Sequence, residues 1–228
     1  MTRVLVIDDH PIVLQGCRQL LVDAGVNQIV QAQSLAEGFK FYRTQKPDVI
    51  IVDLAMRTGT LSGLSFIRRL RLYDNHTPVL VFTMHSDTVI VSNAIELGAT
   101  GYLLKDAPPE EFLKAFQRVS NGKTYISHDL ASDLAFNRGR ERTIPLRNLS
   151  LRELEMLSLL GEGKPYGVIA ANLNVSYKTV ANTAIKLKAK LGVRTLIELT
   201  RLATDYSASQ TEVSRANIAV GVPVKRTN

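Results

Sequence analysis

The stretch VLVIDDHPIV, residues 4–13, joins a short apolar run to two adjacent acids and a proline. Its β-branched run is typical of a strand that is buried on both faces of a sheet. Asp8 and Asp9 then stand side by side where the strand ends, and like charges placed so close repel each other. Asp9 has a simple structural explanation, because an acid just before a proline is a common helix start. The function of Asp8 and Asp9 can therefore be inferred only together with the residues that follow the other strands.

The first 120 residues alternate short apolar runs with helical segments. Runs typical of strands cover 4–7, 48–52 and 78–82, and weaker ones cover 28–32 and 101–104. Helices are expected over 11–24, 34–45, 63–73, 87–97 and 109–120. Five strands alternating with five helices predict an α/β fold, a doubly wound parallel sheet of five strands with helices on both faces.

The rest of the chain is organised differently. We expect the first domain to cover residues 1–123, and the charged stretch 124–146, broken by Gly and Pro, to be a linker. Residues 147–205 hold short helical patterns only, which predicts a small all-α domain. The polar tail, 206–228, lacks periodicity and is expected to be disordered.

The formal net charge of +7 is unevenly distributed. Residues 1–120 hold 12 basic and 12 acidic side chains, whereas 176–201 hold six basic and one acidic. Clustered cations favour a polyanion as the partner of the second domain, although a solvated helix face gives a similar count. No apolar stretch approaches the roughly 18 residues of a membrane span, the first residues do not form a signal-peptide pattern, and Cys17 is single. A cytoplasmic protein without a membrane partner fits these observations.

Polar residues directly follow the predicted strands. In an open parallel sheet, ligands bind beyond the carboxyl ends of the strands, and the residues there are Asp8, Asp9, Asp53, Thr83 and Lys105. Each alone is more often a cap, a turn residue or a surface lysine, but all five at one edge predict a site. Three carboxylates suit Mg²⁺, which takes phosphate oxygens as further ligands, and a carboxylate is the nucleophile in aspartyl-phosphate chemistry. A hydroxyl and an ammonium would stabilise a transferred phosphoryl group.

The motifs around these residues resemble a known family. DDH at 8–10, VDLAM around Asp53, FTMHSD around Thr83 and GATGYLLKDA around Lys105 are similar to the flavodoxin-like receiver domain of bacterial response regulators. The resemblance covers about residues 1–123. It implies that a sensor histidine kinase phosphorylates Asp53. It also implies a Mg²⁺ site made of Asp8, Asp9, Asp53 and the Ala55 carbonyl.

The same resemblance assigns further roles at this edge. Thr83 and Lys105 would contact the phosphoryl oxygens, and Tyr102 would change orientation together with Thr83 on phosphorylation. Up to two added negative charges at one strand end can bias such a two-state element. The loop after Asp53 departs from the family: it reads MRTGTLSG, with Arg57 in place of the usual proline, and it is two residues longer.

The second domain shows three helical patterns. The first follows Ser150 as N-cap, Glu153 completes a capping box, and its apolar face is Leu151, Leu154, Leu157 and Leu160. YGVIAANL gives a second, short helix, and the third covers 177–190 after Ser176 as N-cap. On the third helix the core face is Val180, Ala184, Leu187 and Leu191, and the opposite face is Lys178, Asn182, Ile185, Lys186 and Ala189.

A short helix, a tight turn and a helix with a polar outer face describe a helix-turn-helix whose second helix enters the major groove. Lysines would contact phosphates, Asn182 would pair with adenine, and Ala181 or Ile185 would touch a thymine methyl. The order LSLRELEMLSLL, VIAANLNVSYKTV and KLKAKLGV over 147–204 resembles the LuxR-type helix-turn-helix of NarL/FixJ-type response regulators. The resemblance implies a transcription regulator that binds a palindromic DNA site as a homodimer through residues 194–204. The expected DNA contacts are Lys178, Thr179, Ala181, Asn182, Ile185 and Lys186.

Several usual groove contacts of that family are replaced here. The common Lys and His are Ala181 and Thr183, a position that is sometimes basic is Ile185, and Val168 stands where Glu is usual. Two explanations stay open at this point: an unusual DNA sequence with more apolar contact to thymines, or weak DNA affinity.

Two other functions compete with a regulator that is not itself an enzyme. A Mg²⁺-dependent phosphatase of the haloacid-dehalogenase kind needs Asp-x-Asp after the first strand, and His10 stands at the second of those positions. An interaction or dimerisation module that no longer binds DNA would fit the replacements at 181, 183 and 185. A nucleotide or flavin site is disfavoured, because no glycine-rich phosphate loop follows the first strand.

Overall fold

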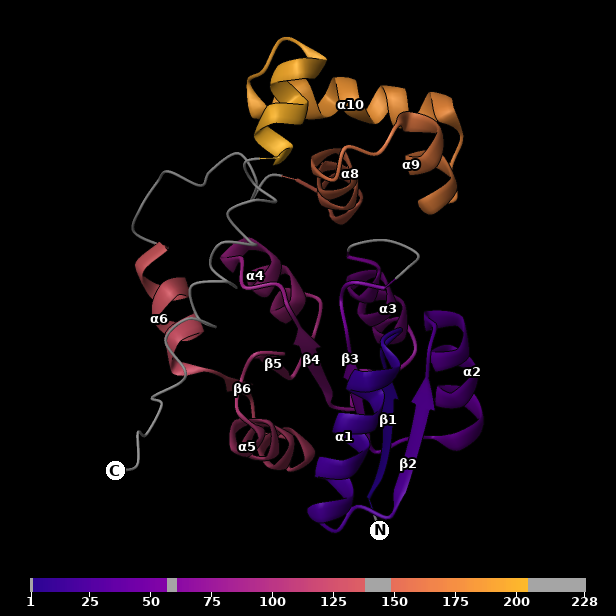
Figure 1. Cartoon of the computed structure of the whole chain (residues 1–228), viewed down its shortest axis with the longest axis vertical. Helices are drawn as coiled ribbons and strands as arrows, with labels where there is room; N and C mark the ends of the chain where they lie inside the picture. Colours follow the sequence, from indigo (N-terminus) through magenta and orange to yellow (C-terminus); the bar gives the residue numbers. More distant parts are fainter. Residues whose placement is uncertain (1, 57–60, 138–148, 205–228) are drawn as a thin grey trace, which may run out of the picture.

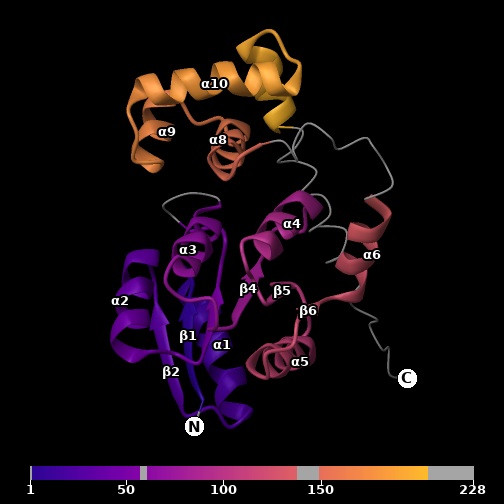
Figure 2. The ribbon, with the colours of Figure 1, turned by 180° about the vertical axis from the view of Figure 1, so that it is seen from behind.

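The computed structural model describes residues 2–56, 61–137 and 149–204. An α/β unit is followed by a small helical unit, which lies above the α3 and α4 end of the α/β unit in Figures 1 and 2. The loop residue Arg57, the later part of the expected linker and the expected disordered tail lie outside the described residues. Within the described ranges, no helix combines the length and apolarity needed to cross a membrane.

The α/β unit is built on one parallel sheet. Its strands are β1 (Arg3–Ile7), β2 (Gln28–Ala32), β3 (Val49–Val52), β4 (Val79–Thr83), β5 (Gly101–Leu104) and β6 (Tyr125–Ile126), in the order β2-β1-β3-β4-β5-β6. The chain leaves β1 on one side for β2 and then returns to its other side as β3. The direction of winding therefore reverses between β1 and β3, and a doubly wound sheet binds ligands at that point.

The predicted five strands are all present, but the sheet has a sixth. Tyr125–Ile126 pairs in parallel with β5, inside the stretch 124–146 that we expected to be a linker. Helix α6 (His128–Asn137) follows it and packs on α4. A two-residue strand is too short to show an alternating or continuous apolar pattern, which is why the sequence did not reveal it.

Helices cover both faces of the sheet, as predicted. Their bounds are α1 (Pro11–Asp23), α2 (Leu35–Gln45), α3 (Ser62–Arg71), α4 (Thr88–Glu96) and α5 (Pro109–Ser120). One core joins one face of the sheet to α3 and α4, and a second core joins the other face to α1 and α5. Central strands such as β3 are buried at every residue because each face meets a helix layer.

The C-terminal unit contains α8 (Leu151–Gly161), α9 (Tyr166–Asn172), α10 (Tyr177–Leu191) and a helix over 196–204. Both predicted N-terminal caps are confirmed: Ser150 and Glu153 form a capping box, and Ser176 Oγ accepts a hydrogen bond from the Thr179 amide. At the other end of α10, Gly192 adopts a left-handed conformation with φ of 70°. The predicted core face of α10, Val180, Ala184, Leu187 and Leu191, is buried.

Helix α8 also contacts the α/β unit through α3. Ser65 Oγ of α3 donates a hydrogen bond to Glu155 Oε1 of α8 over 2.9 Å, and Glu155 is buried. Burial raises the pKa of Glu155 above its ordinary 4.5, although the Ser65 bond and the nearby charges of Arg152 and Arg68 act in the opposite direction. The contact therefore joins the two units through a carboxyl group whose charged form is disfavoured.

Candidate functional site

The strand register brings the predicted site residues to one edge of the sheet. Ile7 pairs with Val52, so Asp8 and Asp53 follow at the same level, and the Asp53 amide donates to the Ile7 carbonyl over 2.9 Å. On the other side, the Lys105 amide donates to the Thr83 carbonyl over 2.9 Å. Asp8, Asp9, Asp53 and Thr83 are all buried. The sheet thus places three carboxylates and a hydroxyl below the surface, at the sheet edge where the direction of winding reverses between β1 and β3.

Lys105 is the cation of this site. Its Nζ lies 2.6 Å from Asp8 Oδ2 and 2.7 Å from Asp53 Oδ2, and its side chain is nearly buried. Burial by itself lowers the pKa of Lys105, but the charges of Asp53 and Asp8 outweigh it and raise the pKa above the ordinary 10.5. A permanently charged ammonium therefore bridges two of the three acids.

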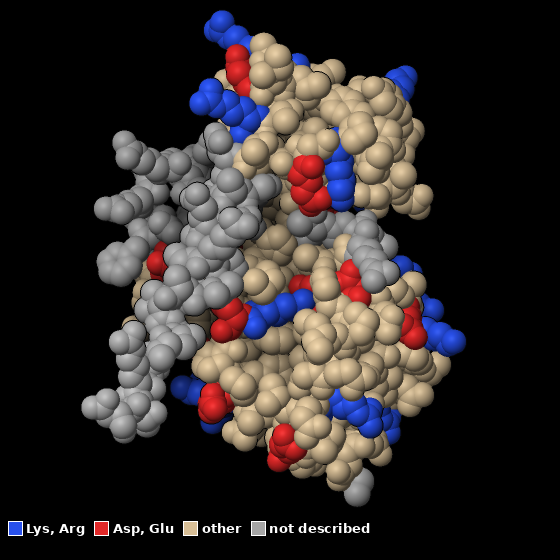
Figure 3. Space-filling view, viewed as in Figure 1, with Lys and Arg blue, Asp and Glu red and all other residues tan. Residues whose placement is uncertain are grey.

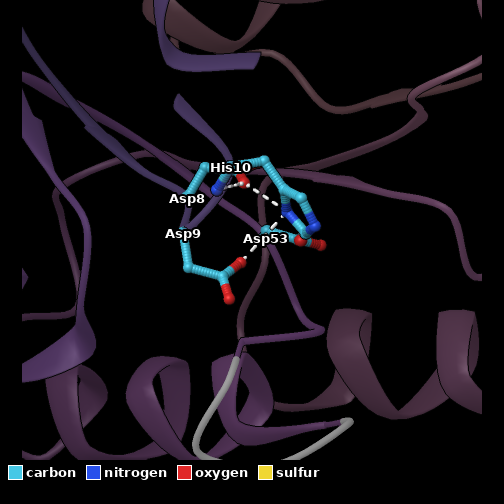
Figure 4. Close-up of side chains that lie close together, drawn as sticks. All are labelled: Asp8, Asp9, His10 and Asp53. Atoms are coloured by element: carbon cyan, nitrogen blue, oxygen red, sulfur yellow. Dashed lines mark hydrogen bonds and ion pairs between the residues drawn. The ribbon is translucent and has the colours of Figure 1, made fainter. Parts of the chain in front are cut away.

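The acids and His10 form a compact donor set, shown in Figure 4. Asp8, Asp9, His10 and Asp53 each offer a ligand atom, and these atoms all lie within 4.8 Å of one another. His10 Nδ1 is 3.1 Å from both Asp8 Oδ1 and Asp9 Oδ1. Among the described residues of this site, three buried carboxylates outnumber the Lys105 ammonium, and this excess of negative charge and oxygen donors fits a divalent cation that prefers oxygen ligands.

The position of His10 decides whether Asp9 is the N-cap of the first helix. The N-cap of α1 is His10, without a side-chain capping bond, and Pro11 takes the first helical turn. The capping explanation for Asp9 is therefore wrong, since Asp9 is not the cap. The sequence singled out His10 only as an argument against a phosphatase; its place next to the two acids was the available signal for its contact with them.

The Thr83 hydroxyl and the buried Tyr102 come from the neighbouring strands β4 and β5, where Thr83 pairs with Leu104 and Tyr102 with Val81. The His85 amide lies 3.5 Å from Thr83 Oγ1, and the Tyr102 hydroxyl donates to the His85 carbonyl over 2.7 Å. Tyr102 is fully buried. The segment after Thr83 is thus tied to Tyr102, which links the two residues predicted to change orientation together.

The start of α3 approaches the acceptor closely. A Cβ on Gly63 would lie 2.2 Å from the Asp53 carbonyl oxygen and 2.7 Å from the Leu54 Cα, and the Gly63 amide donates to the Leu54 carbonyl over 3.0 Å. Only a residue without a side chain fits this approach. The Ala55 amide also donates to Asp53 Oδ1 over 3.2 Å. The backbone on both sides of the unusual loop therefore packs tightly around Asp53.

The second candidate surface is the outer face of α10. Lys178, Thr179, Asn182, Ile185 and Lys186 are exposed, and Ala181 is half-buried. The Thr179 hydroxyl lies 2.9 Å from Ser176 Oγ, so it belongs to the cap of the helix. Figure 3 shows Lys and Arg around the outer edge of this unit, with a few acidic side chains beside them, and both signs of charge over the α/β unit. The face combines cations with an amide and an exposed aliphatic side chain, a composition suited to DNA.

The fold and the two sites define a signalling protein in which a buried acid cluster on a receiver-like sheet is joined to a helix-turn-helix. Comparisons with known proteins agree with this class. Residues 4–117 match the response regulator receiver domain, and residues 147–203 match the bacterial regulatory proteins of the luxR family. The chain belongs to the NarL/FixJ-type response regulators.

Individual relatives resemble the chain over nearly its whole length. The methanol utilization control regulatory protein MoxX of Paracoccus denitrificans is 38% identical over 86% of this chain and 88% of its own. The response regulator UvrY of Escherichia coli K12 is 31% identical over 93% of this chain and 98% of its own. The structure of RcsB from Salmonella enterica serovar Typhimurium, bound to the promoter P1flhDC in the presence of the phosphomimetic BeF3⁻, has a TM-score of 0.68 and 28% identity. That match covers 90% of this chain and 98% of the RcsB chain.

The family assignment confirms the predicted fold, a receiver domain followed by a LuxR-type DNA-binding domain, and the predicted function in transcription regulation. Proteins of this family are generally not enzymes, a receiver domain implies a histidine kinase partner, and acid clusters of this kind typically bind Mg²⁺. The structure brings the predicted receiver residues together at one edge and exposes most of the predicted DNA contacts on one helix. The role of each residue stays a prediction.

Proposed function

We propose that Asp53 accepts a phosphoryl group from a phosphohistidine of a sensor histidine kinase. The observation that carries the proposal is the position of Lys105, whose Nζ bridges Asp53 Oδ2 and Asp8 Oδ2. Transfer breaks the N–P bond of the phosphohistidine and forms an O–P bond to an Asp53 carboxylate oxygen. Lys105 then stands beside the new phosphoryl oxygens and balances their charge.

Asp8, Asp9, Asp53 and the Ala55 carbonyl would hold Mg²⁺. When bound, the ion neutralises negative charge on the phosphoryl group. This chain's own residues supply the remainder: Thr83 offers its hydroxyl to a phosphoryl oxygen, and Tyr102 is tied through His85 to the segment that follows Thr83. A phosphoryl group that draws Thr83 towards Asp53 would therefore disturb the environment of Tyr102.

The output is control of transcription by DNA binding through α10. We infer that Lys178, Thr179, Ala181, Asn182, Ile185 and Lys186 face the DNA, and that residues 194–204 join two copies on a palindromic site. The RcsB structure bound to a promoter supports DNA binding for a protein of the same architecture. We expect a protein that binds DNA and receives a phosphoryl group from a kinase to work in the cytoplasm. We propose no enzymatic activity for it apart from the transfer of the phosphoryl group to its own Asp53.

The test compares wild type with Asp53→Asn. Both are exposed to acetyl phosphate with Mg²⁺, and mass, dimerisation and binding to duplex DNA are measured. Wild type should gain the mass of one phosphoryl group and change its dimerisation and DNA affinity, whereas Asp53→Asn should do neither. Asp23→Asn on the exposed side of α1 is the matched control and should behave as wild type. An identical response of wild type and Asp53→Asn would show that Asp53 is not the switch.

A further inference from the structure

The outer face of α10 combines an exposed aliphatic side chain with an exposed amide between cations. Ile185 is 60% exposed, and Asn182 lies one turn before it on the same face. Lys178 precedes Asn182 by one turn, and Lys186 follows Ile185 directly. Ile185 is not part of the hydrophobic core of its own domain, and a contact with DNA would remove its exposed apolar surface from water.

We propose that Asn182 and Ile185 read two neighbouring A·T base pairs, so that each half-site of the DNA target has an A·T step at its centre. The proposal rests on the DNA-binding function given above and specifies the sequence that this function selects. Asn makes two hydrogen bonds to the N6 and N7 atoms of adenine, and an aliphatic side chain contacts the C5 methyl of thymine.

The spacing of the two residues fits adjacent base pairs. Three residues on an α-helix advance about 4.5 Å along its axis, and successive base pairs are about 3.4 Å apart. The flanking Lys178 and Lys186 lie where phosphates on either side of the groove would meet them. A protein partner is less suited to this face than DNA. Lys178 and Lys186 border Asn182 and Ile185, and the positive charge of these lysines matches a polyanion.

Recognition of thymine by an apolar side chain also explains why positions 181 and 185 of α10 hold no lysine or arginine. Lys178 and Lys186, four residues on either side of Asn182, are assigned to phosphates. A lysine or arginine at position 181 or 185 would instead select guanine through O6 and N7, but these positions hold Ala181 and Ile185. Neither side chain can donate a hydrogen bond to guanine. The centre of this face therefore disfavours G·C pairs and favours A·T pairs.

The test first selects binding sites from a random duplex library with the full-length, phosphorylated wild type. Each thymine of the selected site is then replaced by uracil, which lacks the C5 methyl, and each adenine by 7-deazaadenine, which lacks N7. Loss of one buried methyl is worth about 0.8 kcal/mol, so uracil at one position of a half-site should weaken wild type about fourfold. Ile185→Ala should bind the thymine and uracil duplexes equally, and Ile185→Val should keep part of the difference.

The adenine contact is tested in the same duplex. 7-Deazaadenine at the neighbouring position should weaken wild type by about fivefold to tenfold, as expected for part of a two-bond contact, and it should have no further effect on Asn182→Ala. Ile12→Ala removes an isoleucine that is 81% exposed on α1 of the receiver domain; it is the matched control and should discriminate like wild type.

Three results would overturn the inference. One is a selected site centred on G·C pairs; another is an uracil effect that persists in Ile185→Ala. The third is salt-dependent binding to every duplex without any thymine preference, which would refute the base readout while leaving DNA binding intact. Absence of binding at low salt, even after phosphorylation, would instead refute the DNA-binding function on which the inference rests.

Discussion

Gly63→Ala tests how tightly the backbone holds the phosphoryl acceptor, without changing any carboxylate. The new Cβ would lie 2.2 Å from the Asp53 carbonyl oxygen, and an ordinary contact begins near 3.4 Å. The start of α3 or the Asp53 backbone must therefore move by about 1.2 Å. Overpacking of this kind costs about 3 kcal/mol, and alanine returns about 1 kcal/mol of helix propensity. We expect a net loss of about 2 kcal/mol in the free energy of unfolding.

The displacement should also slow phosphorylation. Misplacement of a reacting group by about 1 Å costs up to about 100-fold in rate, so phosphorylation of Gly63→Ala by acetyl phosphate should be tenfold or more slower. Urea titration and mass spectrometry measure the two effects.

Gly16→Ala is the matched control for this substitution. Gly16 also lies in a helix, α1, and a Cβ there would meet nothing within 4 Å. This variant should gain about 1 kcal/mol in the free energy of unfolding and be phosphorylated at the wild-type rate. If Gly63→Ala matched Gly16→Ala in both measurements, the close approach to Asp53 would not constrain the acceptor, and the reasoning would be refuted.

Three further substitutions test other contacts. Lys105→Met leaves the buried acids without their cation and should destabilise the protein by about 3 kcal/mol in EDTA; thermal melts should show Mg²⁺ restoring part of this loss, and a loss unaffected by Mg²⁺ would count against a cation site. Burial raises the pKa of Glu155, so its contribution to stability is complete below the ordinary pKa of 4.5 and is lost as the pH rises through the raised value. Glu155→Gln should therefore raise the melting temperature at pH 8 and change it little near pH 4, and a shift independent of pH would contradict this assignment. Ser176→Ala removes the cap of α10 and should cost about 1 kcal/mol by urea titration, with Ser120→Ala, which caps no helix start, as the control.

The sheet and the site edge were predictable because both follow from short-range patterns. Buried strands read as continuous apolar runs, and the residue after each run must lie at the carboxyl edge of the sheet. On α10, the steps of three and four between Val180, Ala184, Leu187 and Leu191 separated the core face from the exposed face. The caps Ser150 and Ser176 followed from local hydrogen-bonding chemistry.

The features that the sequence did not reveal depend on distant contacts. Glu155 looks like a solvated residue on an amphipathic helix, and only the arrival of Ser65 from α3 explains its burial. Helix α8 buries a second face because it meets α10 on one side and α3 on the other. The approach of Gly63 to Asp53 likewise depends on how the intervening loop closes, which periodicity does not encode.

The Ser65–Glu155 contact has a consequence for engineering. A chimera would join a foreign receiver to the DNA-binding unit of this chain at the linker. A graft at residue 147 would carry Glu155 along but leave Ser65 behind, and an acid deprived of its hydrogen-bond donor costs about 1–3 kcal/mol when buried. A compatible donor receiver needs a hydroxyl at the position of Ser65, or the graft needs an aliphatic replacement for Glu155. The two units of this protein are thus separable in sequence but matched to each other at the Ser65–Glu155 contact.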